Sequence, residues 1–406
     1  MTIVQNKIMK LTGKVQHYAW GGESFIPAWL NVPNTERKPF AEYWMGAHPS
    51  ASSVLHDEGR EIVLYEGIQE LPVTFLGEKV YNGFGELPYL FKILDVKEML
   101  SIQVHPSKTE AEKGYLAEDE AGVPLSAGHR NYKDKNHKPE VMVALSEFWL
   151  LHGFLVEEKL KHVLTSIPAF EGLITIFERE GYKGLYQHVM ELSQQQVNAV
   201  LMPLVLAELQ KKKAGTLSKE QPGWWVAKAY EHATLLGDID RGVFSIYFFN
   251  IVRTEPGEAV FQGAGVPHAY LEGQNVELMA NSDNVLRGGL TPKHVDVPEL
   301  LKHTIFEGIV PNVMKGENAG GEQNYPCPVP DFGISKLALT GSESHIITTT
   351  SLEIIVVMEG ALQAKGSTNS LSAVKGEAIA IMPNETYTVQ PEGNVLAYRA
   401  FVPYVN

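Results

Sequence analysis

The sequence predicts a mainly β protein that is interrupted by a helical insertion. Short apolar segments, separated by Gly, Pro and Asn, fill both ends of the chain, as is typical of strands joined by turns. Between roughly residues 156 and 233 the apolar spacing changes to that of helices. With 406 residues, 44% of them hydrophobic, the chain exceeds one ordinary core and favours two or three domains.

The first β unit is expected to be divided by the insertion. Its predicted strands are the apolar runs 89–96, 100–104, 141–145, 244–252 and 260–261. A glycine-rich turn follows the last of these runs and leads to His268. We therefore assign residues 1–154 and 239–317 to one β-barrel.

The insertion, residues 155–238, carries helix signals of its own. Ser193 and Gln196 form a capping-box pattern at a helix start. The apolar residues that follow recur at helical spacing: Val197, Val200, Leu201, Leu204 and Val205. We expect Pro203 to kink or divide this helix, because proline lacks the backbone N–H that a helix interior uses.

The last segment, residues 318–406, predicts a second barrel. Its strand signals lie at 346–350, 352–358, 378–382 and 395–401. A short echo supports duplication, since Gly-Glu-Ala-Val at 257–260 is matched by Gly-Glu-Ala-Ile at 376–379. The last histidine of the chain is His345, so the second barrel has no counterpart of His268. If the barrels are duplicates, we expect the second to have lost a metal.

Composition excludes several classes of function. The net charge of −14 is spread along the chain without a basic stripe, which argues against nucleic acid as a partner. The longest apolar runs, such as 354–358, are far shorter than a membrane helix requires. Cys327 is the only cysteine, and residues 1–10 show no apolar leader. We expect a cytoplasmic protein.

Three short segments offer metal-ligand residue types. Gln103 and His105 lie two residues apart on a predicted strand and therefore face the same side. Glu140 follows a proline that favours a strand start, and His268 follows a glycine-rich turn. Such a mixed nitrogen and oxygen set suits zinc, with Mn, Fe or Co as competitors. Their separations along the chain do not by themselves define a metal motif, so ordinary strand or surface roles stay open.

Longer motifs around these residues resemble type I mannose-6-phosphate isomerases. They are Gln-Val-His-Pro at 103–106, His-Lys-Pro-Glu at 137–140, Pro-His-Ala-Tyr at 267–270 and the run from Asn281 to Lys293. The resemblance extends from Tyr-Ala-Trp-Gly at 18–21 to the C-terminal barrel. It implies a pair of cupin (jelly-roll) barrels, one metal-bearing and one degenerate, with a helical domain inserted. The family's substrate is a small sugar phosphate, and we expect a monomer.

Carried over by position, the resemblance implies specific roles for residues of this chain. One zinc ion (Zn2+) per chain is expected on Gln103, His105, Glu140 and His268. Arg287 is expected to be the principal catalytic residue. Other residues are expected in or near the substrate pocket, namely Lys92, Ser101, Lys138, Tyr270, Glu277, Asp283 and Lys293.

The implied reaction moves a proton between C1 and C2 of an open-chain sugar through an enediol. Zinc would act as the electrophile, and Arg287 and Lys293 are cations suited to the phosphate. The base stays open among His137, Lys138, Glu277 and Asp283, since an imidazole titrates near neutral pH while a lysine must first be desolvated or lie near a cation. We favour assistance by His137 and Lys138. Asp283 is equally suited to an Asx turn or to orienting Arg287.

Two other functions fit parts of the pattern. A cupin oxygenase would use a similar ligand set with iron, although the second histidine of the usual three-histidine set is missing. A non-catalytic sugar-phosphate-binding cupin would keep the fold without the chemistry. We expect structural roles for the remaining histidines considered, which are His17, His48, His152 and His294. Trp224 and Trp225 are expected in the core.

Overall fold

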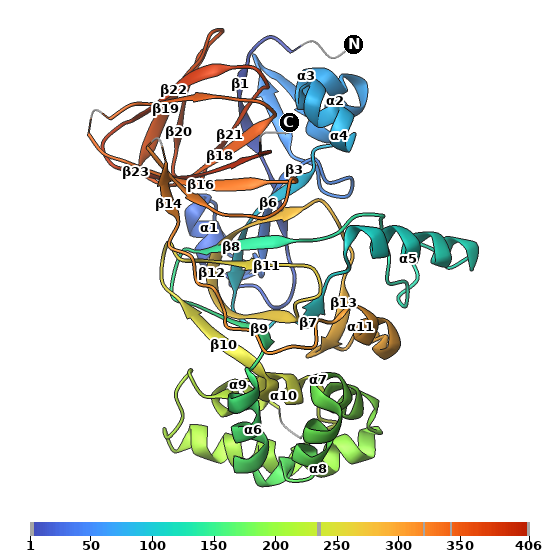
Figure 1. Cartoon of the computed structure of the whole chain (residues 1–406). Helices are drawn as coiled ribbons and strands as arrows, with labels where there is room; N and C mark the ends of the chain where they lie inside the picture. Colours follow the sequence, from blue (N-terminus) through green and yellow to red (C-terminus); the bar gives the residue numbers. More distant parts are fainter. Residues whose placement is uncertain (1–3, 234–236, 320, 342, 404–406) are drawn as a thin grey trace.

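The computed structural model describes residues 4–233, 237–319, 321–341 and 343–403. Three layers follow one another along the molecule: a β-barrel formed mostly by the C-terminal segment, a central β-barrel, and a group of helices at the opposite end (Figure 1). The predicted mainly β fold with a helical insertion is confirmed, and its antiparallel sheets have a jelly-roll-like arrangement.

The central barrel is built around the long strand β12, His268–Ala280. One path of hydrogen-bonded neighbours runs through β10 (Phe249–Thr254), β9 (Phe148–Phe154), β12, β6 (Tyr89–Val96), β3 (Glu42–Gly46) and β2 (Lys14–Gln16). Four shorter strands complete it, namely β7 (Ile102–Val104), β8 (Glu140–Ala144), β11 (Ala259–Gln262) and β13 (Leu286–Gly289). Because β12 pairs with β6, β7, β8 and β9, it brings the two sequence segments on either side of the insertion into one barrel.

The C-terminal barrel combines a large and a small sheet. The large sheet runs β14 (Glu317–Ala319), β15 (Glu322–Tyr325), β16 (Gly333–Leu339), β23 (Val395–Phe401), β18 (Glu353–Glu359), β21 (Ala378–Ile381), β1 (Ile8–Thr12), β4 (Val54–Asp57) and β5 (Arg60–Val63). The small sheet runs β17 (His345–Thr348), β22 (Thr386–Pro391), β19 (Ala361–Lys365) and β20 (Ser370–Val374). The first strand of the chain thus pairs with β21 rather than with the central barrel. The predicted domain boundaries after residues 154, 238 and 317 stay a prediction.

The two barrels share one apolar core. Phe91 of β6 and Tyr398 of β23 belong to the same buried cluster. The side chains of Trp29 in α1 (Phe25–Trp29) and Tyr89 in β6 also donate hydrogen bonds to the backbone carbonyls of Val357 in β18 and Leu352 just before it, at 3.0 Å each. These buried contacts fix the central barrel against its neighbour.

Helices occupy three places in the chain. Short helices α1 (Phe25–Trp29), α2 (Leu64–Glu70), α3 (Pro72–Leu76) and α4 (Glu78–Phe84) precede β6, and α5 (Lys108–Glu120) and α11 (Val297–His303) flank the central barrel. The insertion holds α6 (Glu157–Ser166), η1 (Pro168–Phe170), α7 (Leu173–Glu191), α8 (Gln194–Lys213) and α9 (Pro222–Tyr230), and α10 (Gly242–Phe248) follows it.

The predicted capping box at Ser193 and Gln196 is confirmed at the start of α8. The helix continues through Pro203, so the predicted division at this residue is wrong. Pro203 and Ala199, whose carbonyl loses its helical partner, both lie on the exposed side, where water satisfies that carbonyl. The break in the insertion lies instead at Gly181 of α7, whose φ of 65° is non-helical.

The strand predicted from Phe244 is also corrected. Residues 244–248 belong to α10, and β10 begins only at Phe249. All seven residues of α10 are buried. A short run that is apolar on every side shows no periodicity, so sequence cannot distinguish a buried helical turn from a buried strand.

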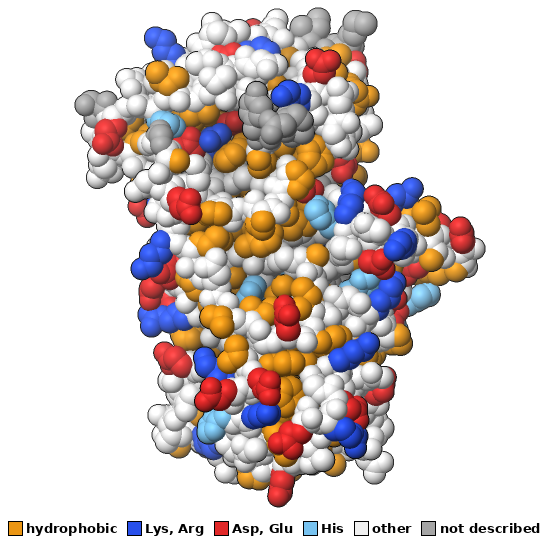
Figure 2. All heavy atoms as spheres, in the orientation of Figure 1, with side chains coloured by type: hydrophobic (Ala, Val, Ile, Leu, Met, Phe, Trp, Pro, Cys, Tyr) orange, Lys and Arg blue, Asp and Glu red, His pale blue; other side chains and the backbone are white. Residues whose placement is uncertain are grey.

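Surface and hydropathy features agree with the composition. Basic and acidic side chains intermix on the face shown in Figure 2. Within the described residues, no helix is both long and apolar enough to cross a membrane.

A buried ionic cluster lies at one end of the C-terminal barrel. Arg399 donates to Glu353 at 2.9 Å and to both carboxylate oxygens of Glu322 at 2.8 and 3.0 Å. Burial raises the pKa of Glu353 to about 7, although Arg399 opposes the shift. The loss of a metal from this barrel stays a prediction.

Glu353→Gln should remove a pH dependence of stability. The pKa of Glu353 rises from about 4.5 to about 7 on folding, so the folded chain holds a proton that the unfolded chain releases in this range. The stability contributed by this group is full below about pH 4.5 and is lost as the pH rises through 7, by up to about 3 kcal/mol. Urea unfolding is measured at several pH values from 5 to 8. The free energy of unfolding of the variant minus that of the wild type should increase as the pH rises.

Glu359→Gln is the matched control, because this glutamate lies exposed at the end of the same strand. Its difference from the wild type should not vary with pH. A Glu353→Gln difference that stays constant from pH 5 to 8 would contradict the expectation.

Candidate active site

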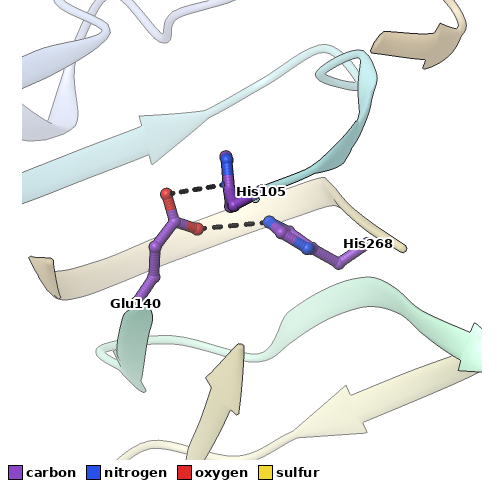
Figure 3. Close-up of side chains that lie close together, drawn as sticks. All are labelled: His105, Glu140 and His268. Atoms are coloured by element: carbon purple, nitrogen blue, oxygen red, sulfur yellow. Dashed lines mark ion pairs between the residues drawn. The ribbon is translucent and has the colours of Figure 1, made fainter. Parts of the chain in front are cut away.

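Three ligand-type side chains converge inside the central barrel. Glu140 opens β8 and His268 opens β12, while His105 directly follows β7. One Glu140 carboxylate oxygen lies 3.5 Å from Nε2 of His105, and the other lies 3.2 Å from Nε2 of His268 (Figure 3). The ligand atoms of the three residues all lie within 4.8 Å of one another.

The backbone fixes which nitrogen of each imidazole carries hydrogen. Nδ1 of His105 lies 2.8 Å from the carbonyl oxygen of Asn284, and Nδ1 of His268 lies 2.9 Å from that of Val266. A carbonyl only accepts, so each Nδ1–H donates and each Nε2 presents a lone pair to Glu140. Both Nε2 atoms are buried without a hydrogen-bond partner among the described residues.

The cluster stays in the protonation state that a metal needs. Burial and Lys138 lower the pKa of His105 to about 4, so its ring is neutral at neutral pH. Burial alone would raise the pKa of Glu140, but Lys138 and His105 outweigh burial and hold this pKa well below its ordinary value. Nζ of Lys138 lies 2.9 Å from the Glu140 carboxylate.

This donor set fits a divalent transition metal. Two lone-pair nitrogens and a carboxylate face each other with no hydrogen between them, an arrangement that a cation stabilises. Two histidines and one carboxylate suit zinc and also non-haem iron. Gln103 lies directly opposite His268 in the β7–β12 pair and lines the same cavity. Its role as fourth ligand stays a prediction.

A pocket leads from the surface to this cluster. The outer part has a volume of about 530 Å³, and a small inner part of about 50 Å³ reaches Glu140 and His268. Of the residues predicted from sequence, the outer part is lined by Lys92, Ser101, Gln103, Lys138, Asp283, Arg287 and Lys293. The inner part adds Tyr270 and Glu277. Side chains far apart in the sequence thus meet as the resemblance implied.

Two cations at the outer part lack counter-ions. Arg287 lies on β13 and is half-buried, and Lys293 is exposed on the loop that follows. Neither forms an ion pair with any described residue. Burial lowers the pKa of Arg287, and burial together with Arg287 lowers the pKa of Lys293, so the two positive charges repel each other. A bound anion would relieve this repulsion.

Lys92, in contrast, is fully compensated. Its Nζ lies 2.9 Å from Glu277 and 3.5 Å from Glu42, and it lies over the ring of Trp44. Burial would lower the pKa of Lys92, but the two glutamates raise it, so the ammonium stays charged. Lys92 therefore contributes a fixed positive charge inside a locally acidic wall.

Tyr270 and Ser101 present hydroxyl groups to the pocket. The Tyr270 hydroxyl is buried and has no hydrogen-bond partner among the described residues. Burial raises its pKa well above the ordinary value, so it stays a hydrogen-bond donor. Ser101 is half-buried just before β7. Both hydroxyls are available to a polar ligand.

His137 does not reach the pocket. Its Nε2 lies 3.0 Å from both carboxylate oxygens of Asp331, which belongs to the segment before β16. The neighbouring Lys138 faces the metal cluster, because successive side chains of an extended chain point to opposite sides. The predicted His137–Lys138 pair therefore divides, and only Lys138 lies beside the site.

Several polar and aromatic side chains in or next to the pocket were not predicted as site residues. Tyr18, Glu42 and Trp44 line the outer part. His48 lies behind it with its Nε2 3.2 Å from Asp283. Trp44 pairs with Lys92 across β3 and β6. Correct prediction of that strand pair would have placed Trp44 on the pocket wall, whereas no sequence pattern indicates the contact of His48.

Known proteins of similar sequence and structure span nearly the whole chain. The mannose-6-phosphate isomerase of Shigella flexneri is 36% identical over 96% of this chain and 98% of its own length. The human mannose-6-phosphate isomerase is 34% identical over 95% of each chain. A crystal structure of the Salmonella typhimurium enzyme bound to fructose 6-phosphate and zinc has a TM-score of 0.87 at 33% identity, covering 98% of this chain and 100% of that one.

Fold and site together define a metal-binding double β-barrel enzyme whose pocket accepts an anion. Residues 8–156 match the family described as phosphomannose isomerase type I, catalytic domain. The chain belongs to the type I phosphomannose isomerase family.

Replacing Glu140 by Gln should weaken metal binding by about 100-fold or more, since the carboxylate is the only negative ligand of the cluster. After dialysis against limiting zinc, mass spectrometry of the metal should find zinc on the wild type and almost none on the variant.

Glu277→Gln offers a control of equal burial in the same pocket, outside the His–Glu–His cluster. It should retain zinc. Stoichiometric zinc on Glu140→Gln would exclude this carboxylate as a ligand.

Proposed function

We propose that this chain interconverts mannose 6-phosphate and fructose 6-phosphate, using one zinc ion. One observation carries the proposal: a His–Glu–His cluster lies at the floor of a pocket whose outer part holds two cations without counter-ions. A sugar phosphate has the matching chemistry, with oxygens at the reacting end and a dianion at the other. The relatives that carry this activity in their names support the assignment.

The metal ligands are proposed to be His105, Glu140, His268 and Gln103. Bound zinc supplies a positive charge that polarises the oxygens of the substrate at the reacting carbons. Zinc is preferred to iron because the similar Salmonella structure holds zinc. Iron in the purified protein together with oxygen consumption would instead favour an oxygenase.

Arg287 and Lys293 are proposed to bind the phosphate. Their unpaired charges lie on one strand and the loop after it, and a guanidinium offers paired N–H donors to phosphate oxygens. The loop itself is held by Asp240, whose carboxylate accepts from the backbone N–H groups of Leu290 and Thr291 at 2.8 and 3.0 Å. A phosphate bound at the outer part of the pocket, away from the metal at the inner part, orients the sugar toward the cluster.

Lys138 is proposed to carry the proton between C1 and C2. The other candidates already have lasting partners: Glu277 has Lys92, Asp283 has His48, and His137 has Asp331. The partner of Lys138 is Glu140, a proposed metal ligand. Lys138 is therefore the candidate whose amine lies beside the metal cluster and also lines the pocket.

The remaining pocket residues are proposed to hold the sugar. Tyr270 and Ser101 donate hydrogen bonds from their hydroxyls, and Asp283 accepts one from a sugar hydroxyl. Lys92 keeps Glu277 in place at the inner part of the pocket. A charged wall on one side and donors on the other fix the orientation of an open-chain substrate.

A coupled assay tests the function directly. Fructose 6-phosphate should form from mannose 6-phosphate, the rate should vanish after treatment with a chelator, and added zinc should restore it. Absence of turnover in protein with one zinc per chain would leave a non-catalytic sugar-phosphate-binding cupin as the better description.

Lys293→Ala should raise KM for mannose 6-phosphate about 10-fold while kcat changes less than about threefold, because an exposed cation contributes to binding of the distant phosphate. Arg287→Ala, which removes paired donors nearer the metal, should lower kcat/KM by about 100-fold. Steady-state kinetics give both values.

Lys315→Ala, at an exposed lysine outside this pocket, serves as the control and should leave KM unchanged. An unchanged KM in Lys293→Ala would remove this residue from the phosphate site.

The domain division at 1–154, 155–238, 239–317 and 318–406, a monomeric state and a cytoplasmic location are also proposed. The location is supported by a single cysteine, Cys327, in a chain of 406 residues, as is usual in reducing compartments. Light scattering of the purified chain tests the oligomeric state.

A further inference from the structure

His48 is a buried imidazole that contacts two residues of the pocket wall, Trp44 and Asp283. It follows β3, is 7% exposed, and packs edge-on against Trp44 with ring centroids 5.0 Å apart. Its Nε2 lies 3.2 Å from Oδ2 of Asp283. Trp44 and Asp283 line the outer pocket, whereas His48 does not.

Ser50 determines which nitrogen of His48 carries hydrogen. The backbone nitrogen and the hydroxyl oxygen of Ser50 lie 3.3 and 2.8 Å from Nδ1. A backbone N–H only donates, so Nδ1 must accept and Nε2 must carry the hydrogen of the neutral ring. Ser50 therefore donates to Nδ1, and the hydrogen on Nε2 faces Oδ2 of Asp283 across 3.2 Å.

Asp283 is held from its backbone as well. Its N–H donates to Asp134 at 2.7 Å, and the side chain of the preceding Ser282 donates to the same carboxylate at 2.8 Å. The Asp283 side chain itself is 53% exposed toward the pocket. The main chain is thus fixed while the carboxylate has a single described side-chain partner, His48. Without it, rotation about the side-chain bonds would be free.

We propose that His48 is a positioning residue that holds the carboxylate of Asp283 in the orientation needed to bind the substrate. This inference rests on the proposed function for its kinetic test. His48 acts through Asp283 alone and does not touch the substrate. A double-mutant cycle can therefore separate positioning from a general contribution to folding.

Two substitutions of His48 differ in what they keep. In His48→Gln the side-chain amide can still donate to Asp283, as Nε2 does. In His48→Asn the shorter amide keeps the contact with Ser50 and cannot reach Asp283. We expect His48→Asn to raise KM for mannose 6-phosphate about 10-fold, and so to lower kcat/KM by the same factor, with kcat changed less than about twofold. The kcat/KM of His48→Gln should stay within about threefold of the wild type.

The double variant decides between the two roles. If His48 acts through Asp283, then His48→Asn should not lower the kcat/KM of Asp283→Asn further. The proposal would be overturned if kcat/KM of the double variant were about 10-fold below that of Asp283→Asn. It would also be overturned if kcat/KM of His48→Gln were no higher than that of His48→Asn. His345→Asn is the matched control, because His345 forms a similar 2.9 Å contact with Glu322 in the C-terminal barrel. It should leave kcat/KM unchanged.

A spectroscopic test does not depend on turnover. Long-range 1H–15N correlation spectra of the full, zinc-loaded chain should show His48 with hydrogen on Nε2, and Asp283→Asn should shift that nitrogen resonance. Hydrogen on Nδ1, or no response to Asp283→Asn, would overturn the inference even in an active enzyme. Failure of the isomerase assay with the expected spectrum would instead overturn the proposed function alone.

Discussion

The site depends on three lone-pair donors that are forced to face one another. Nδ1 of each histidine is engaged by a backbone carbonyl, and the two Nε2 atoms and the Glu140 carboxylate meet inside the barrel. Burying such a set without hydrogen is unfavourable unless a cation enters. The strand pairing of the barrel maintains this unfavourable arrangement, because β12 pairs with four strands and cannot turn His268 away.

Charge is divided along the pocket in a way that suits a substrate with two different ends. Near the metal, Lys92 is enclosed by Glu42 and Glu277 and adds little net attraction for anions. At the outer part, Arg287 and Lys293 are uncompensated, although the chain as a whole carries a net charge of −14. Under the proposed function, this local positive field would guide the phosphate to one end of the pocket and leave the metal for the sugar oxygens.

Sequence predicted some of the strands from apolar runs bounded by turn residues, and β6 and β23 have the predicted bounds, but it predicted no strand at β9, β12 or β16. It failed at residues 244–248, where complete burial hides the helical period. For the site, residue types and strand parity placed Gln103 and His105 on one face, but resemblance was needed to add Glu140 and His268. His137, the sequence neighbour of Lys138, lies outside the pocket, whereas His48, which is distant in sequence, contacts the pocket residue Asp283. Such contacts across the fold leave no local pattern in the sequence.

The C-terminal barrel meets the same electrostatic problem without a metal. Glu322 and Glu353 point inward there, as Glu140 does in the central barrel, and Arg399 lies between them as an internal cation. A guanidinium satisfies several carboxylate oxygens at once, so Arg399 compensates both buried glutamates from within the chain. In the central barrel Lys92 compensates Glu277 and Glu42, and Lys138 contacts one oxygen of Glu140, so among the described residues no cationic side chain lies between Glu140 and the two histidines. A cation at this site would come from solution, and it would face the pocket that leads to the surface.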